Sequence, residues 1–406
     1  MKILVQKFGG TSVESKEKIN EVCKIIKSYK DNNKDLGIVV VVSAMGRKGA
    51  PYATDTLIGL CKEVNTNPSK RELDLIMSCG EIISGTILTN MLKGQGIDSV
   101  FLTGSQAGIY TNGQFSDSRI VDIKPERIYK ELDEGKVVII AGFQGITESG
   151  EITTLGRGGS DTSAVAIGKA LGCKTVEIYT DVDGIMTADP RVEPQAKVLN
   201  SMDYEEVFQM ADKGAKVIHP RAVEIAKSGG ITLNIKNTLN PTYPGTKISG
   251  MAPKFEVNKD IETSKNHMTA VAHKSGLTQI KVKTKEDTFT EIMSQIEENE
   301  ISLDMINFFI EEKAFVIDTD KLEDLSKILK SNNLEFEVKE NCAKVTLIGS
   351  KMTGIPGVMA KIVRALSKAK INLLQTSDSS MTISCLVEEK DMKDAVHSIH
   401  NEFNLN

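Results

Sequence analysis

Two glycine-rich segments of this sequence place bare backbone beside charged side chains. The first, KFGGTSV at 7–13, sets Lys7 just before Gly9 and Gly10. Glycines expose their backbone N–H groups without steric obstruction, and an anion at the start of a helix accepts hydrogen bonds from such groups. The segment therefore fits a phosphate site that Lys7 reinforces, and it fits equally well a tight strand-to-helix turn with a solvated lysine.

The second segment, TTLGRGGSDTSA at 153–164, precedes a helix-like run that starts near Ser160 or Asp161. The first amides of that helix can meet phosphate oxygens, or Ser160 or Asp161 can simply cap it. Arg157 favours a binding role, because a guanidinium in a glycine-lined loop suits bidentate capture of a carboxylate or phosphate.

A glutamate in an apolar setting is a third candidate. In RELDLIMSCGEIISGTILTNML, Glu81 has Met77 and Gly85 one helical turn away on either side and Leu88 two turns on. A semi-buried carboxylate needs a cation, which a substrate ammonium could supply. The alternative is that Glu81 lies at the edge of an amphipathic face.

Two further segments carry charges suited to a nucleotide. YTDVDGIMTADPR (179–191) has three aspartates and ends at Arg191, which fits Mg²⁺ or phosphate binding as well as a set of Asx turns. In GAKVIHPRAVEIA (214–226), Lys216 is a candidate phosphate contact. His219 has no companion histidine at metal spacing, so we expect a structural role for it and no metal coordination by histidine.

These segments must be positioned by a sheet. Continuous Val and Ile runs, typical of strands covered on both faces, alternate with helical patterns. Strand-like runs occupy 2–8, 37–44, 98–104, 136–143 and 174–181, and helix-like runs occupy 15–30, 70–93 and 161–171. The pattern predicts an α/β domain with a largely parallel sheet, whose ligands bind beyond the carboxyl ends of the strands.

The last third of the chain contains an internal repeat. An offset of 70 residues superimposes 291–306 on 361–376 and recurs downstream, which indicates two small βαββαβ units. We predict a catalytic domain at 1–245, a linker at 246–265 and two sister domains at 266–338 and 339–406.

Composition narrows the function classes. The 406 residues suit two or three domains, and a net charge of -5 offers no broad basic field for nucleic acid or a membrane. Six scattered cysteines without a CxxC pair, and the lack of a signal-like or ~18-residue apolar run, predict a cytoplasmic protein. P-loop, dinucleotide-fold and protein-kinase motifs are missing from the sequence.

Taken together, KFGGTSV, SAMG, SCGE, GFQG, TTLGRGGSDTSA, TDVDGIMTADPR and GAKVIHPRA resemble aspartate kinase, of the amino acid kinase superfamily. The repeated unit resembles the pair of ACT domains in that family. The resemblance implies transfer of phosphate from MgATP to the side-chain carboxylate of L-aspartate, giving 4-phospho-L-aspartate, the first step toward diaminopimelate, lysine, threonine and methionine. An aspartate side chain is already ionised near neutral pH, so positioning and charge stabilisation should suffice.

The resemblance also implies roles for residues. Lys7, Gly9 and Gly10 would hold the transferring phosphate, and Asp161 would orient Lys7. Arg157 would bind the aspartate α-carboxylate and Glu81 its ammonium. Thr54 and Ser160 would complete the substrate pocket. The nucleotide contacts would be Thr180, Asp181, Arg191 and Lys216, while Met186 departs from a frequent tyrosine in the family.

Two features resemble the diaminopimelate-regulated isozyme, aspartokinase I: the long SAMGRKGAPYATD loop, and Asp378 and Ser380 in LLQTSDSSMTIS. The first sister domain lacks the Pro-Gly of GIPGV, so we expect the effector in the second. The expected effector contacts are Gly354, Ile355, Gly357, Gln375, Ser377 and Asp378. Lysine is the alternative effector to meso-diaminopimelate.

Other interpretations are weaker. A glutamate or acetylglutamate kinase is disfavoured by the paired ACT-like tail, and an inactive amino-acid sensor should have lost Lys7, Arg157 or Asp161. We expect a monofunctional enzyme, because no residues remain for a fused homoserine dehydrogenase, and a homodimer or higher homo-oligomer formed through the ACT domains.

Overall fold

The computed structural model describes residues 1–215, 218–250, 268–284, 286–350, 352 and 355–405, and it divides into two compact units. The first unit holds Met1–Ile185, Val198–Ala211 and the described residues 218–250. The second holds Met186–Lys197, Asp212–Ala215 and the described residues from 268 onward.

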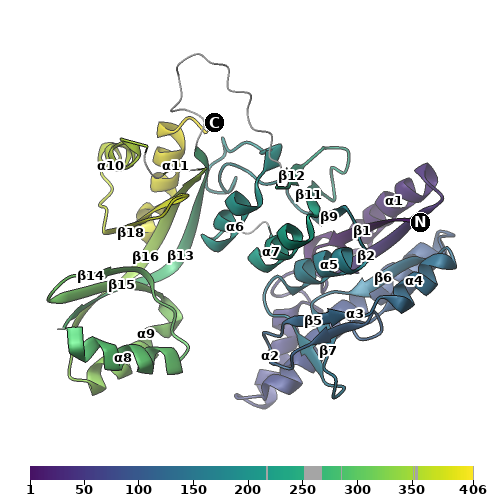
Figure 1. Cartoon of the computed structure of the whole chain (residues 1–406), viewed down its shortest axis with the longest axis horizontal. Helices are drawn as coiled ribbons and strands as arrows, with labels where there is room; N and C mark the ends of the chain where they lie inside the picture. The colour runs from purple at the N-terminus through teal and green to yellow at the C-terminus, as the bar shows by residue number, and fades with distance from the viewer. Residues whose placement is uncertain (216–217, 251–267, 285, 351, 353–354, 406) are drawn as a thin grey trace. The chain divides into compact units, whose positions relative to one another are not determined.

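A largely parallel sheet forms the centre of the first unit, as the sequence predicts (Figure 1). In spatial order its strands are β10 (Ser201–Met202), β12 (Thr246–Ile248), β11 (Thr232–Asn237), β9 (Thr175–Thr180), β1 (Lys2–Phe8), β2 (Leu36–Val42), β6 (Val137–Ala141) and β3 (Ser99–Leu102). All seven residues of β2 are buried, which explains its unbroken apolar run. β12 pairs antiparallel with β11 and buries Thr246 and Ile248, so the start of the predicted 246–265 linker is a strand. Residues 251–265 of that linker lie outside the described residues.

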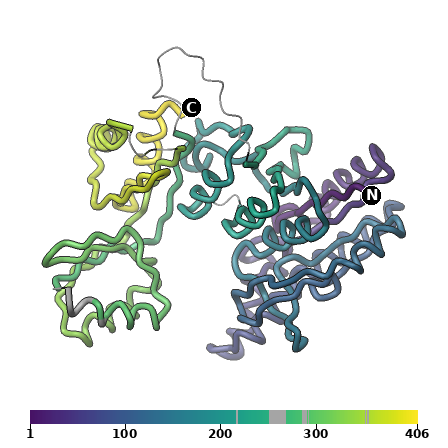
Figure 2. Tube along the Cα trace, viewed as in Figure 1, coloured from purple at the N-terminus to yellow at the C-terminus, as the bar shows by residue number. Residues whose placement is uncertain are grey.

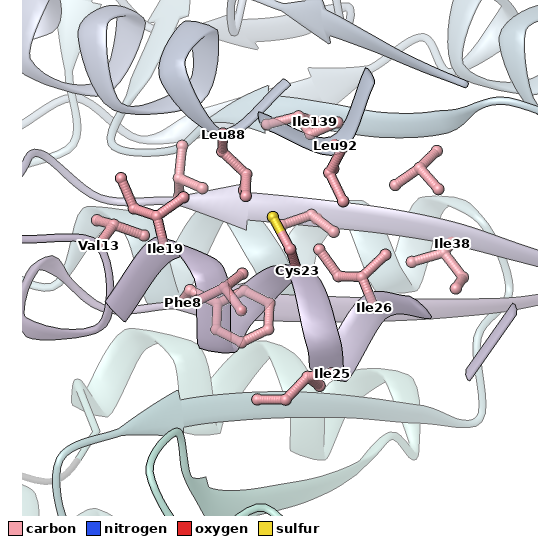
Figure 3. Close-up of a cluster of buried hydrophobic side chains, with 14 of the residues drawn as sticks. Phe8, Val13, Ile19, Cys23, Ile25, Ile26, Ile38, Leu88, Leu92 and Ile139 are labelled. Carbon is pink, nitrogen blue, oxygen red and sulfur yellow. The ribbon is translucent and has the colours of Figure 1, made fainter. Parts of the chain in front are cut away.

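Helices cover the sheet within this unit. They are α1 (Lys16–Asn32), α2 (Thr54–Val64), α3 (Lys70–Gly94), α4 (Glu126–Asp133), α5 (Gly159–Ala170), α6 (Tyr204–Asp212) and α7 (Pro220–Gly229). Figure 3 shows Ile19 and Cys23 of α1 and Leu88 and Leu92 of α3 in one apolar cluster with Phe8 of β1. The bounds of α1, α3 and α5 agree with the predicted helices to within two residues.

Helix α3 carries Glu81 and begins at a defined cap. Its N-cap is Ser69, whose hydroxyl accepts the N–H of Glu72, a capping-box arrangement of the Ser-x-x-Glu type. Among the described residues, α3 is the one helix long and apolar enough to cross a membrane, but half of that stretch is buried inside the unit. Such burial is typical of the core helix of a globular domain.

A smaller four-stranded sheet completes the first unit. Its order is β5 (Ile120–Ile123), β4 (Ile109–Thr111), β7 (Gln144–Ile146) and β8 (Ile152–Thr154). β8 ends directly before the glycine-rich loop at 155–158, so this sheet determines where that loop begins.

The second unit confirms the internal repeat. β15 (Glu312–Asp318) and β18 (Thr382–Glu388) begin 70 residues apart, as do α9 (Leu322–Ser331) and α11 (Met392–Glu402). The remaining elements are β13 (Met268–Lys283), α8 (Glu286–Glu298), β14 (Asp304–Phe308), β16 (Glu335–Gly349), α10 (Val358–Lys368) and β17 (Gln375–Asp378). The six strands form one sheet in the order β14-β15-β13-β16-β18-β17.

Two long strands are shared between the repeats. The second half of β13 pairs with β15 and with the first half of β16, whereas residues 268–274 pair with residues 344–349 of β16. Figure 2 shows the chain of the second unit running from green to yellow through these strands. The predicted boundary at residue 338 does not describe this arrangement fully, because β13 contributes to both repeats.

Residues 186–197 lie inside the predicted catalytic segment but pack with the second unit. The Thr187 hydroxyl and Nε2 of His400 on α11 are 2.8 Å apart, and Nδ1 of His397 is 2.7 Å from the Glu193 carboxylate. Ala188 joins the apolar core of the second repeat. Local sequence patterns gave no sign of this long-range packing.

Candidate active site

Lys7 and Asp161 form an ion pair at the carboxyl edge of the central sheet. Lys7 lies near the end of β1, and its Nζ is 2.6 Å from Oδ1 of Asp161 in the first turn of α5. Both side chains are only 12% exposed. α5 begins at Gly159 with Gly158 as its N-cap, so neither Ser160 nor Asp161 is the cap that the sequence allowed as an alternative. Asp161 instead fixes the Lys7 ammonium.

The loop after β1 approaches its neighbours closely. The Gly9 N–H donates to the carbonyl of Tyr179 at the end of β9. A Cβ on Gly10 would lie 2.7 Å from the carbonyl oxygens of both Ala44 and Gly46, a separation that real Cβ atoms do not tolerate. Glycine is therefore required for the KFGG turn to lie against the SAMG loop, next to Lys7.

Glu81 is almost completely buried, with 2% exposure. Its Oε1 accepts the Ala44 N–H at 2.9 Å, and Gly80 makes this possible because a Cβ there would lie 2.7 Å from that of Ala44. Oε2 has no hydrogen-bond partner within the described part of the chain. Burial raises the pKa of Glu81 to about 8, against the opposing effects of the Ala44 N–H and the nearby Lys7 charge.

An orphaned carboxylate oxygen at this depth is costly unless a ligand satisfies it. The prediction that Glu81 is semi-buried is thus confirmed, and the alternative of a solvated helix edge is wrong. The site offers a cation, Lys7, and a carboxyl group, Glu81, within one buried region.

The glycine-rich loop is held by α7. Arg221 donates to the carbonyl of Leu155 at 3.1 Å and pairs with Asp117 at 2.8 Å. His219 is the N-cap of α7, and its Nδ1 accepts the Arg221 N–H. Burial, followed by the Arg221 charge, lowers the pKa of His219. Its position supports the structural role expected for this histidine.

The remaining predicted substrate residues lie at the starts of two helices and in the glycine-rich loop. Ser160 is buried, and its Cβ would be 2.8 Å from a Cβ built on Gly142. Arg157 is exposed and makes no hydrogen bond or ion pair with any residue that the structure describes. Thr54 is the first residue of α2 and is half-buried.

The predicted nucleotide residues are only partly brought together. Thr180 ends β9 and donates to Asp181, whose carboxylate pairs with Arg47 at 2.7 Å. Arg47, in the SAMG loop, was missed by sequence reasoning because nothing local distinguishes it from a solvated surface arginine. Arg191 belongs to the second unit and pairs there with Asp189, and Lys216 lies outside the described residues.

The predicted effector residues lie in the second repeat. Gly357 is the N-cap of α10 with φ 89°, Ile355 precedes it, and Asp378 is exposed at the end of β17 beside the half-buried Ser377. The amide of Gln375 is already engaged: its Oε1 accepts from Gln279, and its Nε2 donates to Met305 and Asn307. Gly354 lies outside the described residues.

Comparison with known proteins agrees with this geometry. The amino acid kinase family model matches residues 2–237, and an ACT domain model matches residues 337–401. Aspartokinase 1 of Bacillus subtilis is 43% identical, with all of both chains covered. The chain belongs to the aspartokinase family. The aspartokinase of Geobacillus stearothermophilus is 37% identical, with 100% of this chain and 98% of the relative covered.

Solved structures show the same fold. Clostridium acetobutylicum aspartate kinase matches with a TM-score of 0.74 at 25% identity, covering 99% of this chain and 100% of that one. Escherichia coli aspartokinase III, solved with aspartate and ADP, matches with a TM-score of 0.80 at 23% identity and 99% coverage of both chains. The predicted fold class, an amino acid kinase fold followed by ACT domains, is confirmed. The protein is an aspartate kinase enzyme, and kinase relatives imply that it uses ATP.

Proposed function

We propose that this aspartokinase transfers the γ-phosphate of ATP to the side-chain carboxylate of L-aspartate with the residue roles given below, and that an amino acid bound to its ACT domains inhibits it. The observation that carries the proposal is Glu81, a buried carboxylate with one oxygen unpartnered among the described residues, close to the Lys7–Asp161 ion pair. One buried region thus holds a group for an ammonium and a group for a phosphate.

Substrate recognition follows from the charges. Glu81 binds the α-ammonium of aspartate, and Arg157 binds its α-carboxylate, because its guanidinium makes no other contact among the described residues. Thr54 and Ser160 complete the pocket. E. coli aspartokinase III binds aspartate and ADP in its solved complex, which supports the same substrate class here.

Phosphoryl transfer then needs little acid–base chemistry. The β-carboxylate of aspartate is already the nucleophile, so the protein has to align it and neutralise charge on the transferring phosphate. Lys7, held by Asp161, and the Gly10 N–H supply that charge, while Gly9, whose N–H is bonded to the Tyr179 carbonyl, gives the phosphate close access to the backbone. Thr180 and Asp181 of the first unit are proposed nucleotide contacts, and Arg191 and Lys216 remain predictions from the family resemblance. Mg²⁺ would enter with ATP, since it takes many of its ligands from phosphates and water.

The assay is aspartate-dependent hydroxamate formation with ATP and Mg²⁺, with succinate as the comparison. Succinate has both carboxylates but no ammonium, so it would leave Glu81 unsatisfied and should react very poorly. Succinate turnover comparable to that of aspartate would contradict the role of Glu81.

Regulation is proposed to act through the second ACT domain. The turn at Ile355 and Gly357 leads into α10, whose N-terminal amides can bind an α-carboxylate, and exposed Asp378 can accept an ammonium. We favour meso-diaminopimelate over lysine as the effector. E. coli aspartokinase III has been solved with lysine and aspartate, so inhibition assays must include both amino acids.

Self-association is also proposed. β14 is an edge strand that exposes Ile306 and Phe308, an arrangement suited to pairing with a second ACT sheet. Light scattering across protein concentrations tests for the homodimer. We further propose a cytoplasmic location.

A further inference from the structure

Asp74 is a fully buried carboxylate that the proposed chemistry leaves unexplained. It lies on α3 with no exposed surface. Its Oδ2 accepts the backbone N–H groups of Ser116 at 2.9 Å and Thr154 at 2.8 Å. Its Oδ1 accepts the hydroxyls of the same two residues, at 3.2 and 2.9 Å. Four donors from two segments therefore replace the water that this carboxylate loses on burial.

Both segments lead to the substrate loop. Thr154 is the last residue of β8, three positions before Arg157. Ser116 is followed by Asp117, which pairs with the Arg221 that also holds the Leu155 carbonyl. Asp74 thus fixes the start of the glycine-rich loop directly and supports its second anchor through Ser116.

The same helix carries the other half of the substrate site. Asp74 and Glu81 are seven residues apart, about two helical turns, so they occupy one face of α3 roughly 10 Å apart. Both are buried. A rigid helix therefore relates the carboxylate that receives the ammonium to the carboxylate that holds the loop of Arg157.

We infer that Asp74 is a positioning residue for amino-acid recognition: it holds the Arg157 loop at a fixed distance from Glu81, so that one ligand can contact both. This inference rests on the proposed role of Arg157 as the α-carboxylate ligand. A merely structural Asp74 would lower stability, or weaken aspartate and ATP binding alike. A positioning residue affects aspartate selectively.

The decisive variant is Asp74→Ala in the full-length enzyme. It removes all four hydrogen bonds, and we expect KM for aspartate to rise about tenfold or more while KM for ATP stays within about twofold. Asp74→Asn should stay close to the original enzyme. Its amide oxygen can still accept the two N–H groups, and its NH₂ can donate to the two hydroxyls once they rotate.

Two further variants keep the test independent of folding and of the Arg157 assignment. Thr154→Val removes a single hydroxyl contact in a nearly unchanged shape, and it should raise KM for aspartate about threefold without affecting KM for ATP. Glu131→Ala is the matched control. Glu131 is also a buried carboxylate, but it lies on α4 and pairs with Lys136 at 2.8 Å, not with the residues that flank the substrate loop. This variant should leave both KM values unchanged.

The double variant Asp74→Ala/Arg157→Ala should have the aspartate KM of Arg157→Ala alone, since one residue acts through the other. If Arg157→Ala leaves that KM unchanged, the proposed carboxylate role fails and this inference fails with it. A second outcome is that Arg157→Ala raises KM for aspartate but Asp74→Ala leaves it unchanged, and this overturns only the positioning role. Where Asp74→Ala does not fold, Thr154→Val takes its place in this comparison. The positioning role is also overturned if the double variant raises KM for aspartate by the product of the two single effects, because the residues would then act independently.

Discussion

The protonation of Glu81 gives aspartate binding a distinctive pH dependence. Burial holds the pKa of Glu81 at about 8, so the unliganded carboxyl is mostly protonated at pH 7. An ammonium ligand needs the ionised form, and the apparent affinity falls in proportion to the ionised fraction. That fraction is about 1% at pH 6, about 9% at pH 7 and about half at pH 8, since each pH unit below the pKa is a factor of ten.

The dissociation constant of aspartate should therefore decrease about fiftyfold from pH 6 to pH 8 and then level off. Binding at pH 7 should release about 0.9 proton, the protonated fraction of Glu81 in the free enzyme. Isothermal titration calorimetry in buffers of different ionisation enthalpy measures both quantities. His219 should contribute little above pH 7, because its pKa is lowered.

Glu81→Gln is the control for this pH dependence. It should bind aspartate weakly, with no proton release and a dissociation constant that varies little over the same range. Equal affinities of the unaltered enzyme at pH 6 and pH 8, or proton release that persists in the glutamine variant, would refute the reasoning.

Three further predictions concern the Lys7–Asp161 ion pair, the contribution of Glu81 to stability, and the effector site. Lys7→Ala or Asp161→Ala should lower kcat on the order of 10² to 10³-fold with an unchanged circular dichroism spectrum, and near-normal turnover would remove that residue from the mechanism. Glu81→Gln should raise Tm at pH 8 but not at pH 4.5. The folded-state pKa lies above the ordinary value, so the glutamate enzyme loses stability as pH rises between the two; calorimetry showing no gain at pH 8 would contradict this. Asp378→Ala should weaken diaminopimelate inhibition roughly tenfold while leaving the uninhibited kcat unchanged, and an unaltered inhibition curve would exclude Asp378 from the effector site.

Local patterns in the sequence predicted the elements of the fold well. The buried run of β2 identified a central strand, and the 70-residue offset identified the repeated α9 and α11. The sharing of β13 between the repeats was not predictable in the same way. β13 pairs with β16 along both of its halves, and this register depends on pairing between distant residues, which no local sequence pattern contains.

The residues of the candidate site could likewise be predicted only where local sequence distinguishes them. Glu81 was recognisable because Met77 and Gly85 surround it with small and apolar neighbours one turn away. Arg47 was not, because its partner Asp181 is 134 residues distant and both side chains are exposed. The pairing of Lys7 with Asp161 was expected only from the family resemblance, and the structure places the two groups 2.6 Å apart.

For Asp74, the sequence shows the position on the helix but not the hydrogen-bond donors. Its spacing of seven from Glu81 places both carboxylates on one helical face, and that face could have been recognised as buried from Met77 and Leu88. What the spacing does not contain is the identity of the donors, since Ser116 and Thr154 come from segments 42 and 80 residues away. A buried carboxylate of this kind is satisfied by backbone N–H groups and hydroxyls of distant segments, so its role depends on how those segments fold. Sequence reasoning can thus find the carboxylate and its depth, and the fold must supply the residues that it holds in place.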